Sequence, residues 1–294
     1  MRQAKPRPIH KWTALKLEHL DHYLQAYVKA ASRARERHYI DAFAGCGECV
    51  LIDNGFPVMG SPWRALYAIP SFTQYHFVEK KAGLAAHLRK TLSDRGFENA
   101  HAYLGDCNLV LPAEVLPRVP HDVPSFAFLD PTGLQLHWKT IEKLAGHRTG
   151  LRMELLILYP YDMAINRLFG LALASDVLNN TLTRFFGSDS WERQYRESVR
   201  AGEDPHRRRE RFLALYTSVI KGLGYRYVEA YGPLYSGHRP LYNVIFAGDH
   251  PIGAKIMNDV WGKLRFVPGE IGYVPVKRPG VGSRISGKRQ HDGS

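Results

Sequence analysis

The stretch His38-Tyr-Ile-Asp-Ala-Phe-Ala-Gly-Cys-Gly47 decides the fold of this chain. Its first residues are apolar enough for a short strand, and Gly45 and Gly47 let the backbone turn sharply without a Cβ in the way. Asp41 is therefore placed at the carboxyl end of a strand, where open α/β sheets bind their ligands. A lone Gly-x-Gly also fits a buried strand with an ordinary turn, so the later motifs have to decide.

The length and composition allow one large globular domain or two small ones. The chain has 294 residues and is 45% hydrophobic, which is enough for a sizeable core. No apolar run approaches the roughly 18 residues that span a bilayer, so we expect a soluble, cytoplasmic protein with no membrane contact. Three cysteines fit a reducing compartment better than a disulfide framework. We predict a single domain over residues 1–274 and a flexible basic tail over 275–294.

The net charge of +12 is concentrated at the two ends of the chain. Residues 1–40 hold nine Lys or Arg against three acids, and residues 275–294 hold five against one. Basic ends on a nearly neutral body favour attraction to a polyanion, with nucleic acid as the first candidate, although basic tails also serve solubility. The candidate contacts are Arg207, Arg208, Arg209, Lys277 and Arg278. The three arginines could equally form a solvated helix face.

Strands and helices alternate along the first half of the chain. The spacing of Leu17, Leu20 and Leu24 predicts a helix over 13–35, with Lys16 and His19 off the apolar stripe. A loop is expected over 48–59, a helical insertion over about 162–200 and a helix over 212–223. Five parallel strands are predicted, the first within 38–47 with Asp41 at its carboxyl end and the others over 75–79, 101–105, 125–130 and 153–159. An antiparallel pair is predicted over 225–231 and 241–247. This order predicts an α/β, Rossmann-like, doubly wound, seven-stranded and mostly parallel sheet with an antiparallel last strand.

Polar residues follow four of these strands. Asp41 ends the first strand and Glu79 the second, where a carboxylate can accept hydrogen bonds from both hydroxyls of a ribose. Asp106 follows the third strand, where a short acid can accept from an adenine amino group. Asp130 follows the fourth, beside the point where the strand order reverses. The four together predict one ligand pocket.

The combination resembles the class I S-adenosylmethionine-dependent methyltransferase fold and, more narrowly, the three-Cys-motif partner family, TcmP. The resemblance covers roughly residues 10–265 and is more specific in the first half. It rests on Trp12 and Lys16, Tyr39-Ile-Asp-Ala-Phe-Ala-Gly45, Gly60-Ser-Pro62, Phe77-Val-Glu79, and Phe128-Leu-Asp-Pro131 with Gly133. It implies S-adenosylmethionine as cofactor and a partner protein that carries three cysteines. Cys46, Cys49 and Cys107 are not that motif.

The resemblance also implies a role for each strand end. Asp41 would orient water or the methionyl amine, Glu79 would hold the ribose, and Asp106 with Cys107 would face the adenine. Asp130 would lie beside the sulfonium and the incoming substrate. The backbone that covers the methionyl part would come from Phe43, Ala44, Gly45 and Gly47.

The chain departs from the usual methyltransferase pattern in two places. One concerns the methyl acceptor and the other the carboxylate end of the cofactor. Enzymes that methylate base amino groups often carry Asn or Asp, Pro, Pro and an aromatic residue after strand four, whereas this chain has Asp130-Pro131-Thr132-Gly133. Tyr159, at the end of strand five, could supply the missing stacking surface, so Asp130, Pro131 and Tyr159 are the catalytic candidates. Because the loop over 48–59 separates the glycine turn from its helix, Ser61 and that helix start could reach the ligand carboxylate.

Several alternatives remain open from the residues alone. Cys46 and Cys49 have metal-ligand spacing and Cys107 could approach them, but no fourth ligand is indicated, so we expect no metal site. The first functional hypothesis is a methyltransferase acting on nucleic acid, tRNA or DNA. The second is a catalytically silent binding module that serves a partner enzyme or a nucleic-acid complex. A third keeps the nucleotide pocket for another chemistry, such as a deaminase-like repair step.

Overall fold

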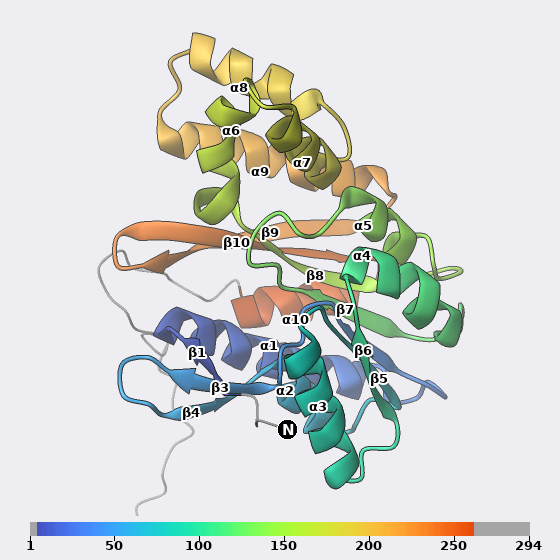
Figure 1. Ribbon diagram of the computed structural model, residues 1–294. Helices are drawn as coiled ribbons and strands as arrows, with labels where there is room; N and C mark the ends of the chain where they lie inside the picture. Colours follow the sequence, from blue (N-terminus) through green and yellow to red (C-terminus); the bar gives the residue numbers. More distant parts are fainter. Residues whose placement is uncertain (1–4, 262–294) are drawn as a thin grey trace, which may run out of the picture.

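The computed structural model describes residues 5–261, which form a sheet with helices on both faces (Figure 1). The sheet strands are β2 (His38–Asp41), β5 (Gln74–Glu79), β6 (Ala100–Leu104), β7 (Ser125–Leu129), β8 (Glu154–Tyr159), β9 (Tyr227–Ser236) and β10 (Arg239–Gly248). Their order is β6-β5-β2-β7-β8-β10-β9. The first five are parallel, and β10 runs antiparallel to both β8 and β9. This is the class I methyltransferase topology, and the predicted fold class is confirmed.

Two cores lie on the two faces of the sheet because successive strand residues point to opposite sides. In β2, Tyr39 belongs to one core and Ile40 to the other. The Tyr39 face is covered by α1 (Lys11–Ala30), α2 (Ser61–Leu66), α3 (Ala82–Asp94) and α10 (Pro251–Trp261). The Ile40 face is covered by α4 (Cys107–Val110), the short turns η1 (Leu111–Val115) and η2 (Leu116–Arg118), α5 (Trp138–Ala145) and the helices of the insertion.

Helix α1 differs from the predicted range of 13–35 at both ends. It begins at Lys11 and ends at Ala30, because the chain has to reverse into β2 within a few residues. The guanidinium of Arg37 holds this reversal by donating to the Ala34 and Ser71 carbonyls, at 2.9 and 3.0 Å. Lys16 and His19 were predicted to lie off the apolar face, but both are buried, since α1 is enclosed by the sheet and by α10.

The predicted loop over 48–59 is wrong, because the segment forms a hairpin. Strands β3 (Glu48–Leu51) and β4 (Pro57–Met59) pair antiparallel, and β1 (Arg7–Ile9) adds to β3 in parallel. The reversal uses Asn54 and Gly55, a common hairpin dipeptide: the Phe56 amide donates to Asn54 Oδ1 at 3.0 Å and Gly55 has φ +71°. This small sheet ties residues 7–9 to the glycine turn after β2.

The helical insertion follows β8 as predicted and forms the layer at the top of Figure 1. It contains η3 (Tyr161–Ile165), α6 (Asn166–Ala172), α7 (Asp176–Phe186) and α8 (Ser190–Arg200), and α9 (Pro205–Gly222) packs with it. Helix α9 begins before the predicted range of 212–223, because Asp204 caps it through the His206 and Arg207 amides. No helix within residues 5–261 is long and apolar enough to cross a membrane. The predicted tail over 275–294 lies outside the described residues, and the single-domain division remains a prediction.

Candidate cofactor pocket

The backbone of the glycine turn after β2 packs directly against the backbone at the start of α2. Gly45 and Gly47 have φ values of +64° and +80°, in the region that favours glycine. A Cβ on Gly47 would lie 2.7 Å from Trp63 Nε1. The Gly60 amide donates to the Gly47 carbonyl at 2.8 Å, and a Cβ on Gly60 would lie 2.7 Å from that oxygen. The glycines are therefore needed for conformation and for close approach.

Asp41 is fully buried beneath this turn. Its Oδ1 accepts from the Phe43 amide at 3.1 Å, and the Ser61 side chain also hydrogen-bonds to the carboxyl group. Burial raises the pKa of Asp41 to about 7, against the hydrogen bonds that favour the charged form. Asp41 thus joins β2 to Ser61, the first residue of α2, whose N-cap is Gly60.

Lys16 of α1 forms a buried ion pair with Asp130, which follows β7. The exposed fractions of the two side chains are 4% and 17%, and the ammonium lies 5.8 Å from the centroid of the Tyr242 ring. Lys16 was missed as a site residue from the sequence. The available signal was its position four residues before Leu20, on the face of α1 that also buries Thr13 and Leu17.

Glu79 holds the glycine turn from the neighbouring strand. Its Oε2 accepts from the Gly45 amide at 3.0 Å and its Oε1 from the Lys81 amide at 2.6 Å. A carboxylate oxygen can accept more than one hydrogen bond, so these contacts leave acceptor capacity for ribose hydroxyls. Glu79 is therefore positioned by the fold and remains able to bind a ligand.

Asp106 ends the third strand of the site and caps α4. Its Oδ1 accepts from the Asn108 amide at 3.0 Å, and its Oδ2 pairs with Lys80 Nζ at 2.9 Å. Burial alone would raise the pKa of Asp106, but the bonds from Lys80 and Asn108 lower it. The adjacent Cys107 is buried, which raises the pKa of its thiol to about 12. A thiol with that pKa stays neutral at physiological pH.

Asn108 is a second residue that the sequence did not single out. Its Nδ2 donates to the Gln135 carbonyl at 2.7 Å, and its Oδ1 accepts from the His137 amide and the Thr140 hydroxyl at 2.9 and 2.8 Å. It therefore fixes the loop after β6 to the loop after β7. No spacing rule reveals such a contact, because its partners lie far along the sequence.

A cavity opens between α1, β3 and the glycine turn. Of the predicted site residues, it is lined by Phe43, Ala44, Gly45, Gly47, Ser61 and Asp130, together with Arg7 and Lys16. Asp41 lies buried below it. Glu79 reaches the cavity wall only through the Gly45 amide, and Asp106, Cys107 and Pro131 do not line it. The structure thus brings together most of the residues that were expected on the methionyl side, and Glu79, which was expected to hold the ribose, lies one hydrogen bond away.

Tyr159 does not offer the stacking surface that was expected of it. Its side chain is 0% exposed, and its hydroxyl donates to the Phe212 carbonyl at 3.1 Å. The rings of Tyr216 and Phe185 lie 4.9 and 6.0 Å from it, centroid to centroid. The helical insertion covers the end of β8, which makes Tyr159 a core residue.

The three arginines of α9 do not form one phosphate-binding edge. Arg209 is buried and donates twice to Asp162, at 2.6 and 2.9 Å. Arg208 donates to the Ser198 hydroxyl at 3.1 Å, and only Arg207 extends into solvent. Consecutive helical residues point in different directions, about 100° apart. Lys277 and Arg278 lie outside the described residues.

The three cysteines are free thiols, and burial raises the pKa of Cys49 to about 11. Within residues 5–261, no group of three or more His, Cys, Asp or Glu side chains could hold a metal ion.

Comparison with known proteins finds distant structural likeness. No protein-family model matches the chain, and no curated protein is similar in sequence. Trm1 from Pyrococcus horikoshii, solved with S-adenosyl-L-methionine, is 10% identical over 84% of this chain and 58% of its own, with a TM-score of 0.46. An rRNA methylase from Streptococcus thermophilus is 16% identical over 78% and 93%, with a TM-score of 0.36. The TYW2 protein of M. jannaschii, in complex with AdoMet, is 11% identical over 77% and 74%, with a TM-score of 0.34.

The chain spans less than two thirds of Trm1. The fold is therefore assigned from the strand order and the antiparallel β10, which give this chain a class I methyltransferase-like fold.

Proposed function

We propose that this chain is an S-adenosylmethionine-dependent methyltransferase of the three-Cys-motif partner type that acts on nucleic acid. The observation that carries the proposal is the hydrogen bond from the Gly45 amide to Glu79. It joins a glycine turn to a strand-end carboxylate at the edge where class I sheets bind their ligands. Asp41 and Asp130 end the flanking β2 and β7 at the same edge.

The side chains fit the chemical parts of this cofactor. Arg7 and Lys16 line the cavity and suit a carboxylate, while Asp130 on the same wall suits a sulfonium and Asp41 supports the turn from below. Glu79 keeps acceptor capacity for two hydroxyls, and Asp106 keeps it for an amino group. The cofactor would supply an electrophilic methyl group on a sulfonium.

The task left to the protein is to position the acceptor and exclude water. Asp130 follows β7 on the wall of the cavity, where its carboxylate can orient an acceptor N–H or O–H. The same carboxylate forms an ion pair with Lys16. Burial of this pair keeps bulk water away from the same position, which strengthens electrostatic interactions there.

Cofactor binding is tested by titrating the full chain with S-adenosylhomocysteine in a calorimeter. The Glu79→Gln variant should bind about tenfold more weakly or worse, because hydrogen bonds to a charged acceptor are lost. Glu98→Gln, an exposed acid between α3 and β6, is the matched control and should bind as wild type does. Absence of binding by the wild type would overturn the proposal.

The carboxylate contact can be tested separately. Lys16→Met should weaken S-adenosylhomocysteine but leave 5′-methylthioadenosine, which has no carboxylate, nearly unchanged. A loss of equal size for both ligands would mean that Lys16 acts on the fold of the pocket and not on the carboxylate.

Nucleic acid as the substrate class is supported by the basic ends of the chain. The test is transfer of a radiolabelled methyl group to total tRNA, DNA or protein from the host. Label in protein alone would overturn the nucleic-acid part. The assignment to the three-Cys-motif partner type is supported by the motifs before Tyr161. Copurification with a tagged form of the chain tests it, and the expected result is a partner protein with three cysteines.

One observation favours a catalytically silent binding module as the second candidate. Lys16 already neutralises Asp130, the acid closest to the expected acceptor position. This alternative predicts that the chain binds RNA or DNA in a salt-sensitive way that does not depend on the cofactor. No methyl transfer to total tRNA, DNA or protein should then be detected.

A further inference from the structure

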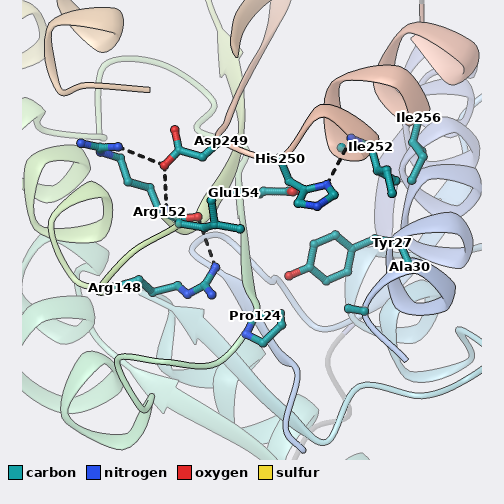
Figure 2. Close-up of a pocket in the computed structure, with 13 residues that line it drawn as sticks. Tyr27, Ala30, Pro124, Arg148, Arg152, Glu154, Asp249, His250, Ile252 and Ile256 are labelled. Atoms are coloured by element: carbon teal, nitrogen blue, oxygen red, sulfur yellow. Dashed lines mark hydrogen bonds and ion pairs between the residues drawn. The ribbon is translucent and has the colours of Figure 1, made fainter. Parts of the chain in front are cut away.

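A second cavity lies at the opposite edge of the sheet from the proposed cofactor pocket (Figure 2). Pro124 precedes β7 and Glu154 begins β8, so this is the amino edge of the parallel strands. The antiparallel β10 ends here, followed by Asp249 and His250. The end of α1 and the start of α10 complete the wall. None of these residues belongs to the site described above.

Arg148 brings an unpaired donor to this cavity. Its Nη1 donates to the Arg152 carbonyl at 3.3 Å, its Nη2 has no acceptor among residues 5–261, and its Nε is buried without one. Arg152 is different, because it pairs with Asp249 at 3.0 Å. Asp249 also accepts from the Arg152 and Arg226 amides, at 2.8 and 3.0 Å, so its carboxylate is satisfied. A buried donor without an acceptor is costly and selects a ligand that offers one.

Tyr27 adds a second donor. Its ring packs on Phe72 and Phe126, and its hydroxyl has no partner within the described part of the chain. Figure 2 shows this hydroxyl and the Arg148 guanidinium facing one another across the cavity. The two donors thus converge on a single acceptor position.

Glu154 supplies the acceptor of the site. The Tyr23 hydroxyl donates to its Oε2 at 2.5 Å, and its Oε1 lies against α10, where a Cβ on Gly253 would come within 2.6 Å of it. Glycine at position 253 therefore lets the carboxyl group stay between the helix and the cavity. Burial raises the pKa of Glu154 to about 7.

The charges and walls narrow the class of ligand. Arg152 and Asp249 neutralise each other, and the Glu154 carboxyl lines the same cavity as Arg148, so the cavity lacks the cluster of unpaired cations that a phosphate needs. A ligand carboxylate would also face Glu154. The remaining walls are apolar, from Ala30, Ala31 and Ile256, and exposed Leu151 and Ile252 stand at the mouth. Such a site suits a neutral ligand with a flat apolar body.

We propose that this cavity binds a neutral planar heterocycle through a lactam edge, the adjacent C=O and N–H found in guanine, hypoxanthine and uracil. The C=O accepts from the Arg148 guanidinium and the Tyr27 hydroxyl, and the N–H donates to Glu154. The proposal does not depend on methyl transfer or on the cofactor pocket.

The test is calorimetric titration of the full chain with guanosine and uridine, with saturating S-adenosylhomocysteine present to block the first pocket. Their matched controls are N1-methylguanosine and N3-methyluridine, in which a methyl group replaces the lactam hydrogen. At least one parent nucleoside should bind, and its methylated form should bind at least about tenfold more weakly, because Glu154 loses its donor. Equal binding of parent and methylated forms, or no binding of either parent, would overturn the proposal.

Three variants locate the ligand. Arg148→Met should abolish measurable binding, and Tyr27→Phe, which keeps the ring packing, should weaken it by about fivefold. Arg193→Met, on the exposed face of α8, should bind as wild type does. Thermal unfolding of each variant shows that the fold is intact. If Tyr27→Phe is folded and binds unchanged, the ligand lies elsewhere and the assignment fails.

Discussion

Lys16 and Asp130, separated by 114 residues, form a buried ion pair that joins helix α1 to the end of strand β7. The pair lies above Asp41, whose charged form is favoured by Lys16 and opposed by Asp130. One cation therefore serves two carboxyl groups at the centre of the proposed pocket. Removing the cation should affect both stability and ligand binding.

Lys16→Met should lower the free energy of unfolding by about 3 kcal/mol, because Asp130 is left buried without its cation. Urea unfolding followed by circular dichroism measures this. The double variant Lys16→Met, Asp130→Asn should recover part of the loss, since no unpaired charge remains. Lys90→Met is the matched control: its partner Asp94 is exposed, and the expected loss is below about 0.5 kcal/mol. Equal losses at the two sites would contradict the role given to burial.

Substitutions at Gly45 and Gly47 distinguish the energetic cost of backbone conformation from the cost of close packing. Both have positive φ, but a Cβ on Gly45 would meet nothing within 4 Å, whereas one on Gly47 would press on Trp63. Gly45→Ala should therefore cost about 1 kcal/mol, from the left-handed conformation alone. Gly47→Ala should cost about 3 kcal/mol, because overpacking is added. Thermal unfolding compares the two, and a larger effect at Gly45 would contradict the packing argument.

The strand order and the strand-end acids could be predicted from the sequence because each depends on local patterns. The alternation of apolar strands with helices fixes a parallel sheet, and Glu79 and Asp106 follow strands that are recognisable by themselves. The antiparallel β9 and β10 were also marked by their short connection.

Long-range contacts could not be predicted. Lys16 is an ordinary helix residue until the fold brings Asp130 next to it, and Tyr159 becomes a core residue only because the insertion covers β8. Arg209 looked like part of a basic cluster, but its partner is Asp162, 47 residues earlier. The hairpin over 48–59 was missed for another reason: Asn54-Gly55 is a turn signal that was not weighed.

Substitutions of Arg209 and of Arg207 should change the free energy of unfolding by different amounts. Arg209→Met leaves Asp162 partly buried and unpaired, so we expect about 3 kcal/mol less stability in urea unfolding. Arg207→Met removes an exposed cation that pairs weakly with Asp204, and the expected change is below about 0.5 kcal/mol. In an RNA-binding titration, Arg207→Met is the more informative variant because its fold is unchanged. Equal destabilisation by both substitutions would argue against the buried pair.

Because the pKa of Asp41 is raised in the folded chain, the free energy of unfolding should depend on pH. The folded chain holds the proton on Asp41 up to about pH 7, whereas the unfolded chain releases it near the ordinary value of 3.8. Between these values the folded state binds more protons, so this group makes the wild type less stable as the pH rises. Asp41→Asn keeps the shape and cannot ionise. Between pH 5 and pH 8 its stability should rise relative to that of the wild type by on the order of 3 kcal/mol, because the wild type loses about 1.4 kcal/mol per pH unit up to pH 7.

Asp249→Asn is the control for this pH dependence. Burial alone would raise the pKa of Asp249, but hydrogen bonds from Arg152 and the Arg226 amide lower it. The stability that Asp249 contributes is therefore complete above the unfolded pKa and is lost only as the pH falls below about 4. Its difference from wild type should stay constant between pH 5 and 8 in urea unfolding, while the Asp41→Asn difference grows. If the Asp41→Asn difference is also constant over this range, Asp41 is already charged in the folded chain. The proposed pocket then contains two carboxylates around Lys16, with a net negative charge.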